Sequence, residues 1–296
     1  TIDSLIFQKF VYIDANGKPL PGIGKEWSIS NNGLTYTFVI DEGQHWQDGS
    51  RLTLDDVLFT FNTAISLSKE KHFDSVGMAL EGISISKVDE RTIQFTLPET
   101  NPTFFEAISI YIVPQSVLGD VAMQDMPFDA FTLTPMGSGK YYVEKTEQNA
   151  VYLVDNPYDD YTPHLTHITF RIYPDYTSLQ MALRVRTVDA LGSLDSEALS
   201  FMQEYPSFGL LLKNEEYRNR AIFFNVRKDS LKDKNIRIGL TYLLDIKELL
   251  RESNIKGEVM QGPYPTTSWA FNNQIDYYAY DSAKAVKFFT DSGYTK

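Results

Sequence analysis

The sequence predicts an α+β protein with at least two lobes. Hairpins with a single helix come first, a strand-helix-strand block follows, and helices dominate from Asn235 onward. This order fits neither the regular strand-helix alternation of a parallel sheet nor an all-β pattern. The chain has 296 residues, 43% of them hydrophobic, which is enough for real cores and too apolar for a disordered chain.

A hairpin is predicted between residues 26 and 43. Asn32-Gly33 suits a tight turn that needs a positive φ. After that turn, apolar Leu34, Tyr36, Phe38 and Ile40 are separated by single residues, which is the period of a strand.

A helix is predicted in TLDDVLFTFNTAI, after a second turn at Asp48-Gly49. Thr53 is the expected N-cap, and Asp55 and Asp56 carry the charge that the positive first turn favours. Its apolar face consists of Val57, Leu58, Phe61 and Ile65.

The remaining elements follow from the same periodicities and turn signals. They are a hairpin at 83–97, short helices or turns at 101–108 and 113–119, a hairpin at 141–157, a strand at 166–174, a capped helix at 175–185, a short strand at 188–191, a helix at 196–206, an apolar strand at 221–226, and helices at 236–253 and 281–294. The seam between lobes is expected near 131–140, where Pro135, Gly137 and Gly139 occur.

Charge and cysteine content exclude several classes of protein. With 27 basic and 39 acidic residues, the net charge is −12. That balance argues against nucleic acid, which needs a basic footprint, and against docking on anionic lipid. The absence of cysteine excludes disulfides, thiolate nucleophiles and thiolate metal sites. No apolar run approaches 18 residues, so no membrane span is expected.

The segment PMGSGKYYV resembles a phosphate-binding loop but fails the tests for one. Thr134 and Tyr141 stand where the phosphate pattern needs glycine and Ser or Thr, and Tyr142 stands where the dinucleotide pattern needs glycine. We therefore interpret Gly137 and Gly139 as a turn or hinge, because glycine adopts dihedrals that other residues cannot.

Several other residues have side chains typical of binding or catalytic sites, but a structural role explains each of them better. Trp46 and Trp269 suggest a sugar-stacking platform, but core packing is the better explanation. His164 and His167 would lie on opposite faces of a strand, so we predict no shared metal. The acidic residues at turns and at the helix start are read as capping and solvation rather than an acid-base pair: Asp41, Glu42, Asp48, Asp55 and Asp56. With no G-x-S-x-G or H-E-x-x-H motif, no enzyme and no cofactor are predicted.

Taken in order, these segments resemble the family 5 extracellular solute-binding proteins of peptide and nickel ABC importers. The stretch from DANGKPLPGIGKEW to LTLDDVLFTF is similar to the family's long signature, and PMGSGKYYV to its P-x-G-[ST]-G-x-Y segment. VDNPYDDYTPHLTHITFRIYPDYTSLQMALRVRTVDAL, FFNVRKDSLKDKNIRIGLTYLLDIKELL and GPYPTTSWAFNN with YDSAKAVKFFTDSGY are similar to later blocks. Lys140 departs from a common proline, and Ser138 from the more frequent threonine.

The resemblance implies a periplasmic-binding-protein-like bilobal fold (type II, cluster C) with an inserted domain. Its expected parts are a main lobe from 1–7 and 131–222, an inserted hairpin-rich domain from 8–130, and the start of a second ligand-binding lobe from 223–296. Family members begin earlier and continue further, so we expect an N-terminal fragment that binds ligand weakly or not at all.

The implied function is capture of oligopeptides outside the membrane and delivery to the permease of an ABC importer, as a monomer. The implied location is the surface of a Gram-positive cell, as a lipoprotein, or the Gram-negative periplasm. A nickel or nickel-chelate binder is the alternative within the family, and a peptide-sensing or adhesion protein on the same scaffold is the alternative outside transport.

By analogy with the family, several residues are expected to line the ligand cleft: Lys71, His72, Phe73, Ser109 and Tyr111 from the inserted domain, and Gly192, Ser193, Leu194 and Asn225 from the main lobe. Each has a structural alternative. Lys71 and His72 also fit a solvated helix end, Phe73 and Tyr111 fit core packing, and Asn225 fits the satisfaction of backbone groups.

Overall fold

The structure is a computed structural model. It describes residues 2–14, 16–69, 79–122, 125–159, 163–191, 220–252, 259–264, 266 and 271–294. The chain divides into two compact units, Thr1–Tyr173 and Pro174–Lys296.

The first unit contains a four-stranded antiparallel sheet of order β3-β4-β6-β5. The strands are β3 (Gly24–Ile29), β4 (Thr35–Ile40), β5 (Ser84–Lys87) and β6 (Thr92–Thr96). Gly33 has a φ of +69° in the turn between β3 and β4, as the Asn32-Gly33 pair predicts. Tyr36, Phe38 and Ile40 are buried and their neighbours are less so, which confirms the predicted strand period.

Helix α2 (Leu54–Lys69) packs on this sheet, and its start is fixed by a buried carboxylate. Asp56 Oδ2 accepts hydrogen bonds from the backbone N–H and the hydroxyl of Thr53, at 2.8 and 3.1 Å. Asp56 Oδ1 accepts from the backbone N–H of Gln115 at 2.9 Å. The residue predicted as a favourable charge is thus a reciprocal cap that also ties α2 to Gln115, the first residue of helix α5 (Gln115–Leu118).

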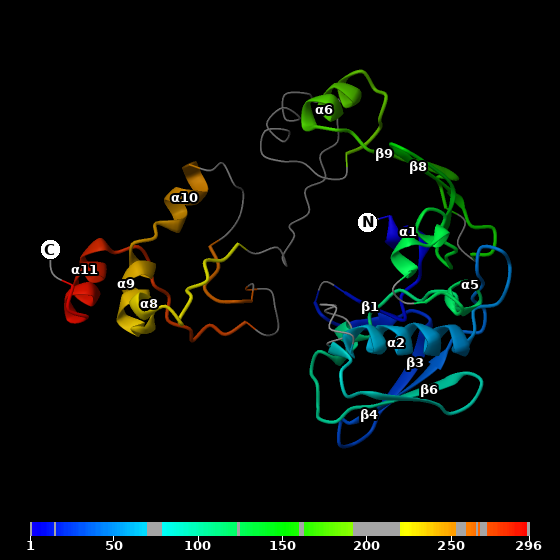
Figure 1. Cartoon of the computed structure of the whole chain (residues 1–296), viewed down its shortest axis with the longest axis horizontal. Helices are drawn as coiled ribbons and strands as arrows, with labels where there is room; N and C mark the ends of the chain where they lie inside the picture. Colours follow the sequence, from blue (N-terminus) through cyan, green and yellow to red (C-terminus); the bar gives the residue numbers. More distant parts are fainter. Residues whose placement is uncertain are drawn as a thin grey trace. The chain divides into compact units, whose positions relative to one another are not determined.

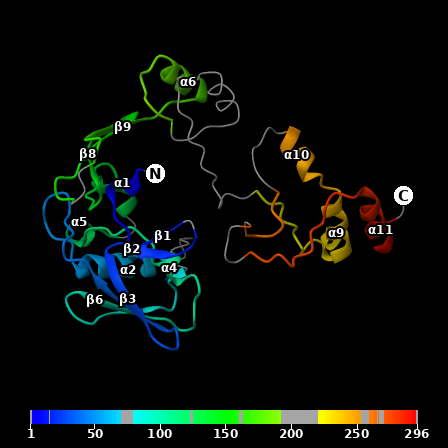
Figure 2. The ribbon, with the colours of Figure 1, turned by 180° about the vertical axis from the view of Figure 1, so that it is seen from behind.

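Aromatic side chains fill the space between α2 and the sheet. Figures 1 and 2 show α2 beside β3 and β6 from both sides. The rings of Phe10, Phe38, Phe61 and Phe95 lie 5.0 to 5.9 Å apart, in tilted and edge-to-face pairs. Trp46 is 1% exposed in the same cluster, so its predicted core role is confirmed.

Shorter elements surround this core. They are β1 (Val11–Ile13), β2 (Pro19–Pro21), α4 (Phe104–Ala107), α5 (Gln115–Leu118), η1 (Met126–Phe128) and η2 (Ala130–Thr132). β1 and β2 pair in an antiparallel ribbon, and α4 contacts β1 (Figure 2).

A second, smaller core lies in the same unit. Its antiparallel sheet has the order β7-β8-β9, formed by β7 (Tyr141–Glu147), β8 (Ala150–Asp155) and β9 (His167–Arg171). Helix α1 (Asp3–Ile6) contacts β7, and its Ile6 packs with Tyr141, Val143 and Leu153. The first residues of the chain therefore join a sheet formed more than 130 positions later.

The second unit is helical in its described part. Its helices are α6 (Tyr176–Arg184), α8 (Asp229–Lys232), α9 (Lys234–Tyr242), α10 (Ile246–Glu252) and α11 (Ser282–Asp291). Three have aspartate N-caps, at Asp175, Asp233 and Asp281. α9 packs against α11, where Tyr242 stacks on Phe288 with ring centroids 5.8 Å apart.

Two predicted strands are absent. Residues 188–191 and 221–226 form no strand, and no segment of the described chain pairs with either. An apolar run favours a strand, but a strand also needs a hydrogen-bonded neighbour. Phe223 is instead 91% exposed. The predicted helix at 196–206 and Trp269 lie outside the described residues.

Candidate functional site

Gly137 and Gly139 are needed for close packing, which corrects the dihedral reason predicted for them. Positive φ among the described glycines occurs elsewhere, at Gly17, Gly33, Gly49, Gly82 and Gly293. A Cβ on Gly137 would lie 2.0 Å from the carbonyl oxygen of Ile6, and one on Gly139 would lie 2.5 Å from that of Leu5. The segment passes so close to α1 that no side chain fits.

The backbone N–H groups of Gly137 and Gly139 already have acceptors. Gly139 donates to the carbonyl oxygen of Ile6 at 2.7 Å, and Gly137 donates to Oε1 of Gln47 at 3.1 Å. A phosphate loop presents such groups to its ligand. The geometry therefore agrees with an architectural role for the two glycines.

Nearby, two distant segments run side by side and bring predicted site residues together. Lys9 and Tyr111 form an antiparallel bridge. Phe10 N donates to Ile110 O at 2.9 Å, and Ile112 N donates to Gln8 O at 3.1 Å. This ladder fixes which side chains of the two segments are neighbours.

Side chains of these two segments, together with Phe131 of η2, form a half-buried group that we call the Lys9 cluster: Phe7, Lys9, Ser109, Tyr111 and Phe131. Lys9 Nζ donates to Ser109 Oγ at 3.3 Å and lies 5.3 Å from the centroid of the Tyr111 ring. The Phe7 ring lies 6.1 Å from that of Tyr111 and 6.0 Å from that of Phe131. The cluster thus joins one ammonium group and hydroxyl groups to an aromatic wall.

Tyr12 adds a polar group beside the Lys9 cluster. Its phenol oxygen accepts a hydrogen bond from the backbone N–H of Lys9 at 3.3 Å. Burial raises the pKa of Tyr12, the Lys9 bond opposes that shift, and the charges of Tyr111 and Asp159 add to it. The Tyr12 phenol is therefore neutral at pH 7, and its O–H group is a donor.

Of the predicted cleft residues, Ser109 and Tyr111 meet in the Lys9 cluster. Asn225 lies in the other unit, where its side chain accepts from Arg227 N at 3.1 Å and its carbonyl oxygen from Lys228 N at 3.1 Å. That arrangement matches the structural alternative for Asn225. Lys71, His72, Phe73, Gly192, Ser193 and Leu194 lie outside the described residues.

Sequence patterns did not reveal Lys9, Phe7 and Phe131 as site residues. Lys9 lies 100 positions from Ser109, so no local pattern links them. The one available signal was a lysine inside the otherwise apolar or uncharged run SLIFQKFVYI. An element that serves only to fill a core rarely contains a charged residue, so a lysine in this run indicates another role.

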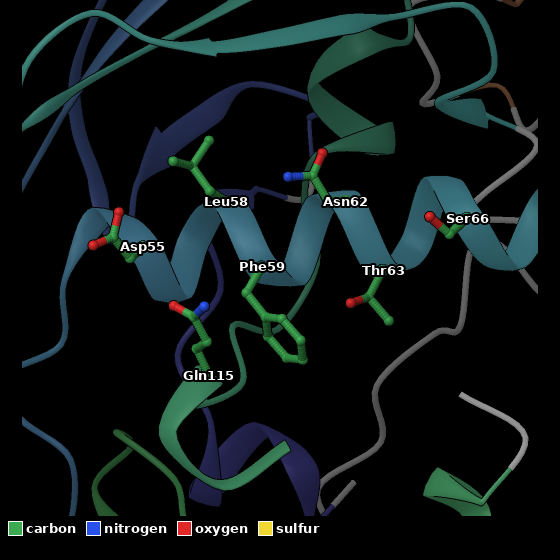
Figure 3. A pocket seen from close by; sticks show the side chains of 7 residues that line it. All are labelled: Asp55, Leu58, Phe59, Asn62, Thr63, Ser66 and Gln115. Carbon is green, nitrogen blue, oxygen red and sulfur yellow. The ribbon is translucent and has the colours of Figure 1, made fainter. Parts of the chain in front are cut away.

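Two surface pockets lie elsewhere. One of about 460 Å³ follows α2. Figure 3 shows Asp55, Leu58, Phe59, Asn62, Thr63 and Ser66 along α2, with Gln115 reaching toward the helix from α5. The other, of about 480 Å³, lies between α9 and α11 and is mainly apolar, with Ile236, Leu240 and Phe289 in its wall.

The described residues carry neither a metal-donor group nor a helix of membrane-spanning character. The described residues contain no group of three or more His, Asp or Glu placed to hold a metal ion. His167 is the first residue of β9, and His164 precedes the strand. The two histidines therefore do not lie in one strand, as the prediction of opposite faces assumed. None of the helices in the described ranges has the length and apolar character that crossing a bilayer requires.

The chain matches one known protein family over most of its length. "Bacterial extracellular solute-binding proteins, family 5 Middle" matches residues 18–296. Heme-binding protein A of Haemophilus influenzae is 27% identical over 93% of this chain and 54% of that protein. The dipeptide-binding protein of Escherichia coli is 23% identical over 94% of this chain and 55% of its own length. The chain thus spans about half the length of these curated relatives.

Solved structures agree in fold. CtaP of Listeria monocytogenes, an ABC transporter substrate-binding protein, has a TM-score of 0.84 and 26% identity, covering 99% of this chain and 60% of that one. NikZ of Campylobacter jejuni, in complex with Ni(L-His), has a TM-score of 0.82 and 25% identity, covering 99% and 58%. The predicted mixed α and β fold of a periplasmic binding protein is confirmed.

Proposed function

The chain belongs to the bacterial extracellular solute-binding proteins of family 5, and from that premise we propose that it captures oligopeptides for an ABC importer. The observation that carries the proposal is the family match over residues 18–296. A dipeptide-binding protein among the relatives and a transporter-associated protein among the structures support it.

The Lys9 cluster supports a peptide as the ligand. A peptide presents a carboxylate, backbone amides and apolar side chains. The cluster presents one cation, the hydroxyls of Ser109 and Tyr111, and two phenylalanine rings. Mostly apolar walls with a few placed polar groups are typical of ligand sites.

In this proposal, two lobes close on the peptide and the closed form delivers it to a membrane permease. As predicted above, the main lobe is 1–7 with 131–222 and carries the inserted domain 8–130, and the second lobe begins with 223–296. The two separate cores of the first unit support the first division, because one core uses residues of 10–112 and the other combines Ile6 with β7 and β8. Binding needs many weak contacts and no bond making.

Nickel, as a chelate, is the second candidate, because NikZ was solved with Ni(L-His). The ammonium of Lys9 repels a bare divalent cation but is compatible with a chelate that carries carboxylates. Heme is a further ligand class, because one relative is a heme-binding protein. Heme also carries carboxylates.

Isothermal titration calorimetry distinguishes these ligands. The longest polypeptide that the gene encodes is titrated with a mixed peptide library, nickel chloride, nickel with L-histidine, and hemin. We expect heat of binding from the peptides. Binding of nickel-histidine or hemin with none from the peptides would overturn the peptide assignment.

Deleting the neighbouring permease gene separates import from sensing. We expect uptake of a labelled peptide to be lost. Unchanged uptake would favour a peptide-sensing or adhesion role. Cell fractionation tests the proposed location outside the cytoplasm, as a surface lipoprotein or a periplasmic protein.

A further inference from the structure

Lys9 differs in burial and in ion pairing from three other lysines of the first unit. Lys25, Lys87 and Lys145 each lie within 3.4 Å of a carboxylate oxygen and are exposed or nearly so. Lys9 is half-buried, and the ion pairs of the described residues do not include it. Other basic residues of the described first unit without an ion pair, such as Lys18 and Arg51, are exposed, whereas Lys9 is half-buried.

The hydrogen-bonding capacity of Lys9 is only partly used. An ammonium group has three N–H donors. Ser109 Oγ accepts one at 3.3 Å, and the Tyr111 ring lies 5.3 Å away. Partial burial of an N–H donor costs free energy unless the donor has a hydrogen-bond acceptor. An anionic acceptor makes the strongest hydrogen bond with an ammonium group.

We propose that Lys9 binds a carboxylate group of the ligand, an inference that rests on the proposed peptide-binding function. Ser109 and the Tyr111 ring hold the ammonium in place, because each contacts Nζ from the neighbouring strand-like segment. The Tyr12 phenol oxygen accepts a hydrogen bond from the backbone N–H of Lys9, so Tyr12 packs against the same segment.

The charge of the surroundings favours a carboxylate over a phosphate. The Lys9 cluster contains a single cation, and the negative charge of Asp159 acts on the adjacent Tyr12. A phosphate group carries close to two negative charges at pH 7, and its usual sites combine several cations or backbone donors. One cation near one carboxylate balances a single negative charge.

Three peptides test the proposal: Ala-Ala-Ala with a free C-terminal carboxylate, Ala-Ala-Ala amide, and Ala-Glu-Ala amide. We expect the amide without a glutamate to bind the unaltered protein most weakly. Lys9→Met keeps most of the aliphatic stem and removes the charge. We expect it to weaken binding of a carboxylate peptide about 10- to 100-fold and to leave Ala-Ala-Ala amide unchanged.

The two carboxylate peptides identify the source of the group. If Lys9→Met weakens only Ala-Ala-Ala, Lys9 binds the C-terminal carboxylate. If it weakens only Ala-Glu-Ala amide, Lys9 binds an acidic side chain. Both results support the inference.

Lys25→Met is the matched control, because it makes the same charge change at an exposed lysine paired with Asp41. We expect its affinities to equal those of the unaltered protein. Lys9→Arg should retain the preference for carboxylates, which keeps the test meaningful if Lys9→Met folds poorly by circular dichroism. Equal weakening of all three peptides by Lys9→Met, or none, overturns the Lys9 inference and leaves peptide binding intact. If the unaltered protein binds none of them, the peptide proposal fails, and the inference fails with it.

Discussion

The four-stranded sheet with α2 and the helices of the second unit both have the apolar faces that their sequences predict, but they bury them differently. In the first region Phe38, Phe61 and Phe95 are fully buried. In the second, Met181 of α6 and Val286 of α11 are each 53% exposed. Periodicity therefore makes an element amphipathic, but burial depends on a complementary surface being present.

The two units that contain these regions also use glycine and aspartate differently. In the first, Gly137 is required by a close neighbour, and Asp56 is a buried cap with three partners. In the second, Gly293 is required by a φ of +85° in open space, and Asp281 is a more exposed cap. The same type of substitution made in each unit therefore tests whether tight packing makes the first unit more sensitive to mutation than the second.

The largest difference is expected for phenylalanine truncation. Phe38→Ala should lower the free energy of unfolding of the first unit by about 3–5 kcal/mol, because it leaves a cavity among packed rings. Phe223→Ala should change that of the second unit by less than about 0.5 kcal/mol, because its side chain is already exposed. Hydrogen exchange with mass spectrometry reports each unit separately. Equal losses would remove the distinction between the regions.

Glycine substitution should give the next largest difference. Gly137→Ala forces a Cβ against the Ile6 carbonyl, 2.0 Å away. We expect it to destabilise the first unit by about 3 kcal/mol, as overpacking does. Gly293→Ala should cost about 1 kcal/mol, because only its backbone dihedral is unfavourable. Urea denaturation measures both, and a smaller effect at Gly137 would contradict the close-packing explanation.

Helix caps should differ less. Asp56→Ala leaves the N–H groups of Thr53 and Gln115 without their acceptor, which should cost about 2 kcal/mol. Asp56→Asn retains an acceptor and is the control for side-chain size. Asp281→Ala should have a smaller effect, confined to the first turn of α11, because water replaces the lost acceptor there. Amide exchange rates of Thr53 and Lys284 compare the two caps directly.

The smallest effect concerns acid stability. A hydrogen bond from the Ser50 hydroxyl is the main cause that lowers the pKa of Asp48 below its ordinary value of 3.8, and a backbone bond from Lys284 lowers that of Asp281. A carboxyl with a lower pKa in the folded state stabilises the fold above the ordinary value. That contribution is lost as the pH falls below 3.8 and through the folded-state pKa.

We therefore expect Asp48→Asn and Asp281→Asn each to flatten the acid side of the stability curve of its own unit. Urea midpoints measured from pH 6 down to pH 2 check this. A curve that stays as steep in either variant would show that other carboxyls control the acid response of that unit.

Local chemistry was predicted well from sequence. The Asn32-Gly33 turn, the alternation from Tyr36 to Ile40 and the Thr53 start of α2 all depend on residues within a few positions of one another. Their energetics are set by turn dihedrals, strand pleat and helix capping, which depend on the local sequence and not on the surrounding fold.

Predictions that required a distant partner were wrong or incomplete. Residues 221–226 have strand-like composition, but the described chain offers them no paired neighbour. Gly137 and Gly139 were predicted from conformational freedom, whereas the reason for them is the backbone of Ile6. Asp56 was expected to interact favourably with the helix dipole. Its hydrogen bond from Gln115 N, 59 residues away, could be identified only from the tertiary structure.

The sequence by itself determined the family and the turns, caps and periodic elements that depend on near neighbours, because those interactions are encoded within short windows of the chain. Only the tertiary structure decided which faces are buried, why the two glycines are needed, and that Lys9 lies against Ser109 and Tyr111. Such contacts join segments about a hundred residues apart, so their energies depend on packing that no local pattern contains.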